Sequence, residues 1–143
     1  MVVVDGKGIP LGKHLDSVSS AEVRLAEKTL ATIRVPRRCR AGRPRQKPER
    51  VIADKGYDSD PLRGRRARRH IELIAPHRSG RRKPPTQDGR CVRRYRRRWI
   101  IERTFAWLGN YRRLTVRWDR SLTIYSAFFH IACFMIVLRR VVQ

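Results

Sequence analysis

One stretch, predicted to form a single helix, constrains the fold of this chain more than any other feature. From Tyr95 to Leu108 no proline or glycine breaks the sequence, and the helix is predicted to end at Gly109-Asn110. At 3.6 residues per turn, the single carboxylate of this stretch shares a stripe with an aromatic side chain and an arginine, and an adjoining apolar stripe is predicted to seat the helix on the core. The first stripe comprises Tyr95, Arg98 or Trp99, Glu102 and Ala106, and the second comprises Ile101, Phe105 and Leu108.

A second carboxylate is predicted at the end of a buried strand. Val51-Ile52-Ala53 is a short apolar run that leads into Asp54 and a glycine turn. Further on, Asp58 or Asp60 is predicted to cap a helix whose first position is Pro61. A strand-end carboxylate and a helix-borne carboxylate suit two-metal phosphoryl chemistry, because hard divalent cations take oxygen ligands. Spacing alone leaves open the ordinary alternative, in which each acid is only an ion-pair partner of nearby arginines.

These two stretches together resemble the second and third acidic motifs of insertion-sequence transposases with a DDE catalytic centre and a ribonuclease H-like fold. The strand–turn–strand from Val4 to Leu11 is similar to one found in the same domain. The resemblance covers most of the chain and is more specific than any single motif. The matching pieces are Ala53 to Ser59, then Tyr95, Arg98 and Glu102 at the family's spacing, continued as Arg103 to Leu108 and Tyr111 to Leu114.

The resemblance implies an α/β fold, namely a ribonuclease H-like mixed sheet with flanking helices that lacks its first strand. In the family, the first catalytic aspartate lies on a strand upstream of the position of Met1. Asp5 is a poor substitute, because it lies on the turn after the next strand. We therefore expect residues 1–143 to be the C-terminal part of a DDE transposase catalytic domain. Such a chain is either a truncated copy or one product of an element whose transposase is split between reading frames.

The activity implied by the resemblance is DNA transposition, in which DNA strands are cleaved and transferred with the help of a metal. Magnesium or manganese held by Asp54 and Glu102 would activate water, and then a 3′ hydroxyl, for attack on phosphodiesters. Because phosphoryl transfer depends on positioning and charge stabilisation, two of three carboxylates are too few for normal turnover. Whether this chain is itself an enzyme therefore stays open.

Four further residues are expected to contact DNA. Tyr95 and Arg98 match family positions that support the site and the DNA end. The family often has a lysine or arginine seven positions after the glutamate, but this sequence has Gly109 there. Arg112 and Arg113, about a turn further on, are the remaining candidates to hold the terminal phosphate.

The charge balance favours a polyanionic partner independently of any motif. Lysine and arginine number 35 against 12 aspartates and glutamates, which gives a net charge of +23. Two stretches rich in proline, glycine and basic residues, at about 36–50 and 77–91, are predicted to be loops that contact phosphates. The expected partners are DNA at transposon ends and target, an N-terminal transposase fragment, and further copies of the chain on DNA. The alternative is a non-catalytic basic nucleic-acid-binding protein.

The most apolar segment, from Leu122 to Leu138, raises the possibility of a membrane span. About 17 residues is at the short edge of what crosses a bilayer. A polar stripe of Thr123, Ser126 and His130 favours a buried helix of a soluble domain, with the histidine satisfied in the core and no membrane contact. Cys39, Cys91 and Cys133 form no paired motif, which fits a reducing cytoplasm. The resemblance implies a bacterial cytoplasmic protein associated with the nucleoid.

The remaining elements follow from shorter patterns. Met1 to Val4 is predicted to be a strand, and Leu62 to His70 a short arginine-rich helix. Ser17 to Ile33 is predicted to be an amphipathic helix with Ser19 or Ser20 as its N-cap, and Ile71 to Pro76 a strand. Trp99 and Trp107 are expected in the core.

Overall fold

Strands and helices alternate along the chain in the structure, a computed structural model that describes residues 1–16, 22–36, 42–116 and 118–142. Strand β1 (Val2–Val4) pairs antiparallel with β2 (Pro10–Lys13), and β3 (Arg50–Ile52) pairs parallel with β4 (Glu72–Ile74). The helices are α1 (Glu22–Ala31), α2 (Asp60–Arg68), α3 (Gly89–Tyr95), α4 (Trp99–Gly109), α5 (Arg112–Thr115) and α6 (Leu122–Val142), with 3-10 turns η1 (Lys55–Tyr57) and η2 (Arg96–Arg98).

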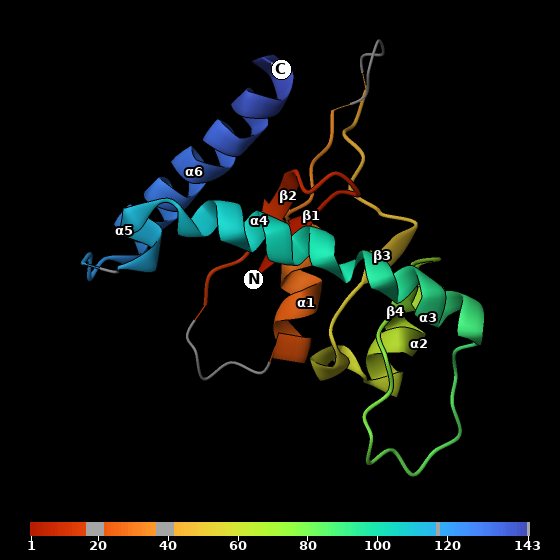
Figure 1. Ribbon diagram of the computed structural model, residues 1–143. Helices are drawn as coiled ribbons and strands as arrows, with labels where there is room; N and C mark the ends of the chain where they lie inside the picture. The colour runs from red at the N-terminus through yellow and green to blue at the C-terminus, as the bar shows by residue number, and fades with distance from the viewer. Residues whose placement is uncertain (17–21, 37–41, 117, 143) are drawn as a thin grey trace.

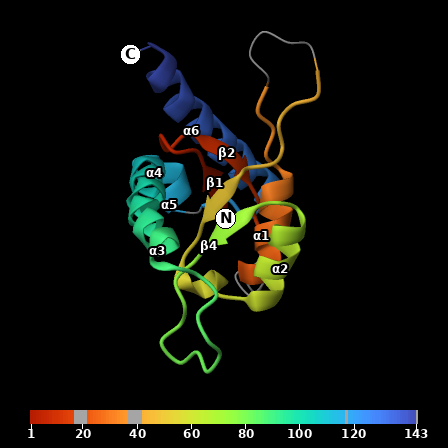
Figure 2. The same cartoon turned by 90° about the vertical axis from the view of Figure 1, so that its right-hand side faces the viewer.

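The strands lie between two layers of helices. Seen from the side, α1 and α2 cover one side of the strands, and α3, α4 and α5 cover the other (Figure 2). α4 crosses in front of β1 and β2, α3 lies next to β3 and β4, and α6 runs away from the strands behind α5 (Figure 1). The α/β class is therefore confirmed. The expected single mixed sheet is not formed by the described residues, whose strands make two separate pairs, because no ladder joins β1 to β3.

The turn after β1 fixes the first strand pair against α4. Asp5 Oδ1 accepts hydrogen bonds from the backbone N–H groups of Lys7 and Ile9, each at 2.8 Å. Gly8 has a φ of +86°, and a Cβ there would lie 2.9 Å from Thr104 Oγ1. Only glycine combines this backbone with this close approach. Asp5 therefore stabilises the turn with its side chain.

The buried face of α4 differs from the prediction. Ile100, Thr104 and Leu108 are its buried residues, whereas Phe105 is 51% exposed and Ile101 is half-buried. Thr104 is tolerated in the core because its hydroxyl donates to Gly8 O at 2.8 Å or to Ile100 O at 3.1 Å. The helix is thus rotated by about one residue from the orientation that the apolar pattern predicts.

Helix α2 begins as predicted but with a different cap. Pro61 lies in its first turn, while Ser59 is the N-cap and accepts from the Leu62 N–H. Asp58 and Asp60 are therefore not the caps, because their carboxylates are bonded to arginines. The proposed caps of α1, Ser19 and Ser20, lie outside the described residues, as do 37–41 of the first basic loop.

Helix α6 is longer and more exposed than predicted. By length and composition it is apolar enough to cross a membrane, and 17% of its apolar window is buried in the structure. Phe129, Ala132 and Ile136 pack with Leu108 along one narrow stripe. His130 lies on the exposed side, so the prediction of a core histidine is wrong.

Candidate active site

The structure brings Asp54 and Glu102 to one guanidinium group. Arg98 Nη1 lies 2.9 Å from Asp54 Oδ1, and Arg98 Nη2 lies 2.6 Å from Glu102 Oε1. The carboxylates come from different elements, one directly after β3 and one in the first turn of α4. Both are exposed, at 58% and 56% of their side-chain area. The predicted strand-end and helix-borne acids are therefore neighbours in space.

Asp54 is held by the backbone as well as by side chains. It is the N-cap of η1, and its Oδ1 accepts from the Lys55 N–H at 2.8 Å. Tyr95 donates its hydroxyl to the same oxygen at 3.1 Å. The backbone hydrogen bond from Lys55, followed by those from Tyr95 and Arg98, holds the pKa of Asp54 below its usual value despite partial burial. The site therefore keeps Asp54 ionised at neutral pH.

Tyr95 and Arg98 are positioned by the junction of α3 and α4. The 3-10 turn η2 separates the two helices and carries Arg98 at its end. The guanidinium carbon of Arg98 lies 5.5 Å from the Tyr95 ring centroid, which adds a cation–π contact. Burial, followed by the interaction with Asp54, raises the pKa of Tyr95. Its hydroxyl therefore stays a hydrogen-bond donor to the carboxylate.

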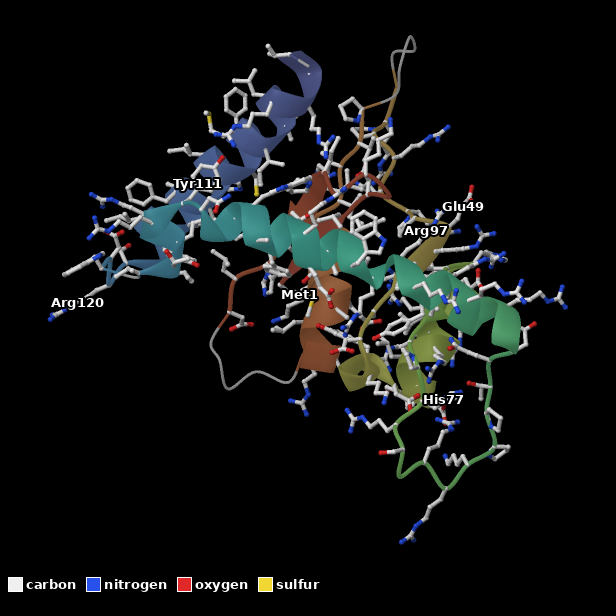
Figure 3. All side chains as sticks on the ribbon, in the orientation of Figure 1. Met1, Glu49, His77, Arg97, Tyr111 and Arg120 are labelled. Atoms are coloured by element: carbon white, nitrogen blue, oxygen red, sulfur yellow. The ribbon has the colours of Figure 1, made fainter. Side chains whose placement is uncertain are left out.

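A third acid, Asp58, organises the loop that follows Asp54. Its side chain is 3% exposed and accepts hydrogen bonds from the Arg78 N–H at 2.8 Å, from His77 Nδ1 at 3.0 Å and from the Arg63 guanidinium. Figure 3 marks His77 where the chain leaves β4 for the second basic loop. Burial would raise the pKa of Asp58, but these bonds outweigh it and hold the pKa well below the ordinary value of 3.8. Sequence reasoning considered Asp58 only as a helix cap, and nothing local indicated its partners.

The donors at Asp54 and Glu102 suit a hard divalent cation. Mg²⁺ is commonly bound through one or two carboxylates and completed by water and phosphate oxygens. Arg98 engages one oxygen of each carboxylate, so Asp54 Oδ2 and Glu102 Oε2 would be the oxygens left to hold a metal ion. In the part of the chain that the structure describes, no group of three or more His, Cys, Asp and Glu side chains is arranged to hold a metal. The donor set therefore fits such an ion in part, with two carboxylates.

Arg112 and Arg113 lie at the other end of α4. This helix is 11 residues long and so spans about 16 Å, with Glu102 near its start and α5 beyond its end. In Figure 3 the labelled Arg97 and Tyr111 mark the two ends. Arg113 pairs with Asp119 at 3.7 Å and stacks on Phe128 at 4.7 Å. The structure therefore does not bring these arginines to the acid pair.

An aromatic and arginine stack follows the exposed side of α4. Arg103 lies 4.6 Å from the ring of Trp99 and 4.7 Å from that of Trp107. Trp99 is 52% exposed, so its predicted place in the core is wrong. Arg103 also donates to Lys7 O at 2.8 Å, which ties this stack to the turn after β1.

Comparison with known proteins gives the family. The family described as Transposase DDE domain matches residues 1–138. Over 135 residues the chain is 38% identical to a protein named as the transposase of insertion sequence element IS402 from Burkholderia cepacia, and the match covers 94% of this chain and 60% of that protein. Over 94 residues the chain is 40% identical to a protein of Brucella ovis named as the transposase of insertion sequence element IS6501. This match covers 62% of this chain and 67% of that protein.

No solved structure matches the chain. The chain spans 60% of the length of the IS402 relative. The family match extends over both acidic motifs and over the helix that carries Glu102, and it includes the residues that hold Asp54 in place. On this evidence the chain belongs to the insertion-sequence transposases with a DDE domain.

Proposed function

We propose that Asp54 and Glu102 are the part of a DNA transposase's catalytic centre that this chain carries. The observation behind the proposal is their convergence on Arg98, at 2.9 and 2.6 Å, from two separate elements. Exposed ion pairs contribute little to stability, so stability alone does not explain why two carboxylates from separate elements share one guanidinium. The fold proposed for the complete domain is the ribonuclease H-like one, which would place both acids at one end of its sheet.

In this function Asp54 and Glu102 bind Mg²⁺ or Mn²⁺ through their free oxygens. A bound divalent ion would supply charge stabilisation at the phosphodiester oxygens and a more acidic water. Tyr95 and the Lys55 N–H orient the Asp54 carboxylate, and Arg98 keeps the two carboxylates together before DNA arrives. A phosphate group then competes with the carboxylates for the Arg98 guanidinium, which binds carboxylates and phosphates alike through two parallel hydrogen bonds.

DNA contacts extend beyond the acids in this proposal. Tyr95 and Arg98 lie beside the acids and serve the DNA end. Arg112 and Arg113, at the far end of α4, contact the duplex backbone away from the acids and contribute position rather than sequence recognition. The basic loops at about 36–50 and 77–91 add further phosphate contacts.

The chain acts, in our proposal, as one part of a larger assembly. Residues 1–143 form the C-terminal part of the catalytic domain in this proposal, and an N-terminal transposase fragment is the proposed partner. Further copies assemble on transposon-end and target DNA. The proposed compartment is the bacterial cytoplasm, at the nucleoid.

Metal binding tests this function directly. Titration of Mn²⁺ into the full chain, followed calorimetrically, should show affinity reduced by at least about tenfold in Asp54→Asn and in Glu102→Gln, the lower end of what even outer-shell groups contribute. Asp88→Asn is the matched control, because its carboxylate is also 58% exposed. Plasmid nicking with Mn²⁺, assayed with and without the upstream transposase region, should depend on both acids. Equal Mn²⁺ affinity and equal nicking in all variants would refute the proposal.

A non-catalytic nucleic-acid-binding protein is the second candidate. It is favoured by the net charge of +23. Under this alternative the two acid variants leave Mn²⁺ affinity unchanged and alter DNA binding no more than Asp88→Asn does. The same titration therefore separates the two functions.

A further inference from the structure

Helix α6 carries two apolar stripes, and only one of them is packed against the rest of the chain. The packed stripe lies against α4 and α5 and comprises Tyr125, Phe129, Ala132, Cys133 and Ile136. The C-terminal end of α6 extends away from the strands in both views (Figures 1 and 2). The other stripe is exposed along its whole length and comprises Ile124, Ala127, Ile131, Phe134, Leu138 and Val141.

The exposed stripe has the spacing of a coiled-coil seam. Its members are separated alternately by three and four positions, which is the a and d pattern that repeats every 3.5 residues. The a positions are Ile124, Ile131 and Leu138, and the d positions are Ala127, Phe134 and Val141. Helices with this pattern insert their a and d side chains between those of a second helix.

The exposure of these side chains is unusual for a protein surface. Ile131 is 56% exposed, Phe134 61% and Val141 76%. Single exposed apolar residues are common, whereas a continuous row of them marks an interaction surface. The stripe is therefore a candidate site for a partner.

Charged residues are absent from this part of a strongly basic chain. The net charge is +23, yet Leu122 to Leu138 contains no lysine, arginine, aspartate or glutamate. Arg140 belongs to the packed side of α6, where its guanidinium lies 5.0 Å from the Trp107 ring centroid. Nucleic acid does not fit such a surface, because its binding depends on basic groups that neutralise phosphates. The positions that flank the seam are also uncharged at neutral pH or apolar: Thr123, Phe128, Met135, Val137 and Val142.

We propose that the exposed stripe of α6 pairs with the same stripe of a second copy of this chain, with the two helices antiparallel. A surface that meets its own copy across a two-fold axis must complement itself, and two identical seams do so. Centring the pair between Ile131 and Phe134 places Ala127 opposite Leu138 of the second copy. Small side chains then face large ones, as good packing requires. A parallel pair would instead place Ala127 on Ala127 and leave a gap.

The antiparallel arrangement also suits the charge of the chain. The body of each chain packs against α6 between Tyr125 and Ile136, which leaves the C-terminal end of the helix projecting. In an antiparallel pair the two bodies therefore lie toward opposite ends. This separation reduces the repulsion between two chains that each carry +23.

A lipid bilayer is the other apolar environment to consider, because α6 is long and apolar enough to span one. The packed side of the helix is, however, tied to a basic side chain. Lys13 Nζ donates to Ser126 O and to Ser126 Oγ, each at 2.8 Å, and lies 4.8 Å from the Phe129 ring centroid. Placing this lysine at the depth of a membrane is costly. A second copy therefore fits α6 better than lipid does.

The proposal deepens the proposed function by naming the surface through which copies of the chain assemble. It rests on that function only for the role of the pair on DNA. A pair of chains would carry two sets of Asp54 and Glu102, one set for each of two DNA strands or ends.

Sedimentation velocity on the full chain, without DNA or metal, tests the pairing. The chain should form dimers at or below about 100 μM, the weak end of specific association. Ile131→Glu and Phe134→Glu should each weaken the dimer at least about tenfold, because they place like charges in the seam. Phe105→Glu is the matched control, since Phe105 is also about half exposed, at 51%, but lies on α4. Its dimerisation should equal that of the unaltered chain.

Salt separates this dimer from chains bridged by residual nucleic acid. Raising the salt from about 0.1 M to about 0.5 M should strengthen the proposed dimer, because screening reduces repulsion between the basic bodies. Bridging by nucleic acid would weaken over the same range. Association that weakens with salt therefore overturns the proposal.

Engineered cysteines test the orientation and do not depend on the charge variants. The background is Cys39→Ser, Cys91→Ser and Cys133→Ala. Ala127→Cys combined with Leu138→Cys should give a disulfide-linked dimer under mild oxidation, because the two positions face each other only in the antiparallel pair. Either change alone should give none. A dimer linked through Ala127→Cys alone would overturn the antiparallel arrangement.

The remaining outcomes also decide the matter. The proposal is overturned if the chain stays monomeric at about 100 μM, or if the α6 variants dimerise as the control does. It is also overturned if the chain sediments with phosphatidylcholine–phosphatidylglycerol vesicles and the α6 variants abolish this. Dimers with unaltered Mn²⁺ affinity in Asp54→Asn and Glu102→Gln would support α6 pairing and refute the catalytic role. Metal binding that depends on both acids in a strictly monomeric chain has the opposite meaning.

Discussion

Replacing Asp58 by asparagine should loosen the loop that positions Asp54. The Asp58 carboxylate is 3% exposed and joins three segments, because its partners are Arg63 on α2 and His77, Arg78 and Arg81 on the second basic loop. Asparagine keeps the size of the side chain but removes its charge. Arg63, itself 12% exposed, then loses its ionic partner.

The expected cost follows from the geometry of this cluster. Removing one partner of a fully buried ion pair costs about 3–5 kcal/mol, and a hydrogen bond to a charged group contributes about 1.5–3 kcal/mol. Because this cluster lies just beneath the surface and asparagine retains one acceptor, we expect a loss of about 2–3 kcal/mol. That corresponds to a Tm lower by roughly 4–12 °C in a chain of this size. Asp60→Asn, whose carboxylate also pairs with Arg81 but is 33% exposed, should lower Tm less.

The pH dependence gives a second readout. The pKa of Asp58 in the folded chain lies well below the ordinary 3.8, so its stabilising effect is complete above about pH 5 and is lost as the pH falls toward the folded pKa. The difference in Tm between the unaltered chain and Asp58→Asn, followed by circular dichroism, should therefore shrink between pH 5 and about pH 2. A difference that stays constant over this range, or one no larger than that of Asp60→Asn, would refute the reasoning.

Three further outcomes are expected. Gly8→Ala should destabilise the chain by about 1–3 kcal/mol in thermal melts, because Gly8 has a positive φ and its added Cβ would lie too close to Thr104. Gly64→Ala is the control: its added Cβ meets nothing within 4 Å, so the change should stabilise α2 and the chain by about 0.5–1 kcal/mol. Arg112→Ala and Arg113→Ala should each reduce the salt slope of duplex DNA binding by about 1 without changing sequence preference, as measured by fluorescence anisotropy. After expression in bacteria, alkaline carbonate should leave the chain in the supernatant; recovery in the membrane pellet would instead make α6 a membrane span.

Local patterns predicted most elements. The helix expected to run unbroken from Tyr95 to Leu108 is, however, divided by the 3-10 turn η2 before α4 begins at Trp99. The strand expected to be buried before Asp54 is β3, whose Val51 and Ile52 are only half-buried. The β-branched run at Val2–Val4, the apolar run before Asp54, and the Gly109-Asn110 stop each depend on neighbouring residues, and the structure has a strand or a helix end at each. Proximity of Asp54, Arg98 and Glu102 was predictable only through the family resemblance, since no spacing rule relates a strand end to a distant helix. Its detail, one guanidinium between two carboxylates, required the structure.

The predictions for Asp58 and Trp99 are wrong for the same reason, which is that contacts with other residues in the folded chain decide where these side chains lie. Asp58 has the composition of a helix cap, but His77 and Arg78 arrive from a loop about twenty positions later and compete for its oxygens. Capping propensity depends on neighbouring residues and does not include such distant partners. With Asp58 bonded elsewhere, Ser59 is the N-cap of α2. Trp99 was assigned to the core by its size, but Arg103 covers its ring and allows half of it to remain exposed.

The misplaced apolar stripe of α4 has a different cause. Its residues Ile101 and Phe105 follow a core pattern, yet Phe105 is 51% exposed and Ile101 is half-buried. Burying an aromatic side chain of this size stabilises a fold by about 1.5–3 kcal/mol, so the exposure of Phe105 forgoes part of that stabilisation. The adjoining stripe is buried instead because Thr104 fits against Gly8, where a Cβ would lie 2.9 Å from the Thr104 hydroxyl oxygen. Periodicity therefore predicts an apolar stripe on this helix, whereas the choice between two adjoining stripes depends on a contact between residues about a hundred positions apart.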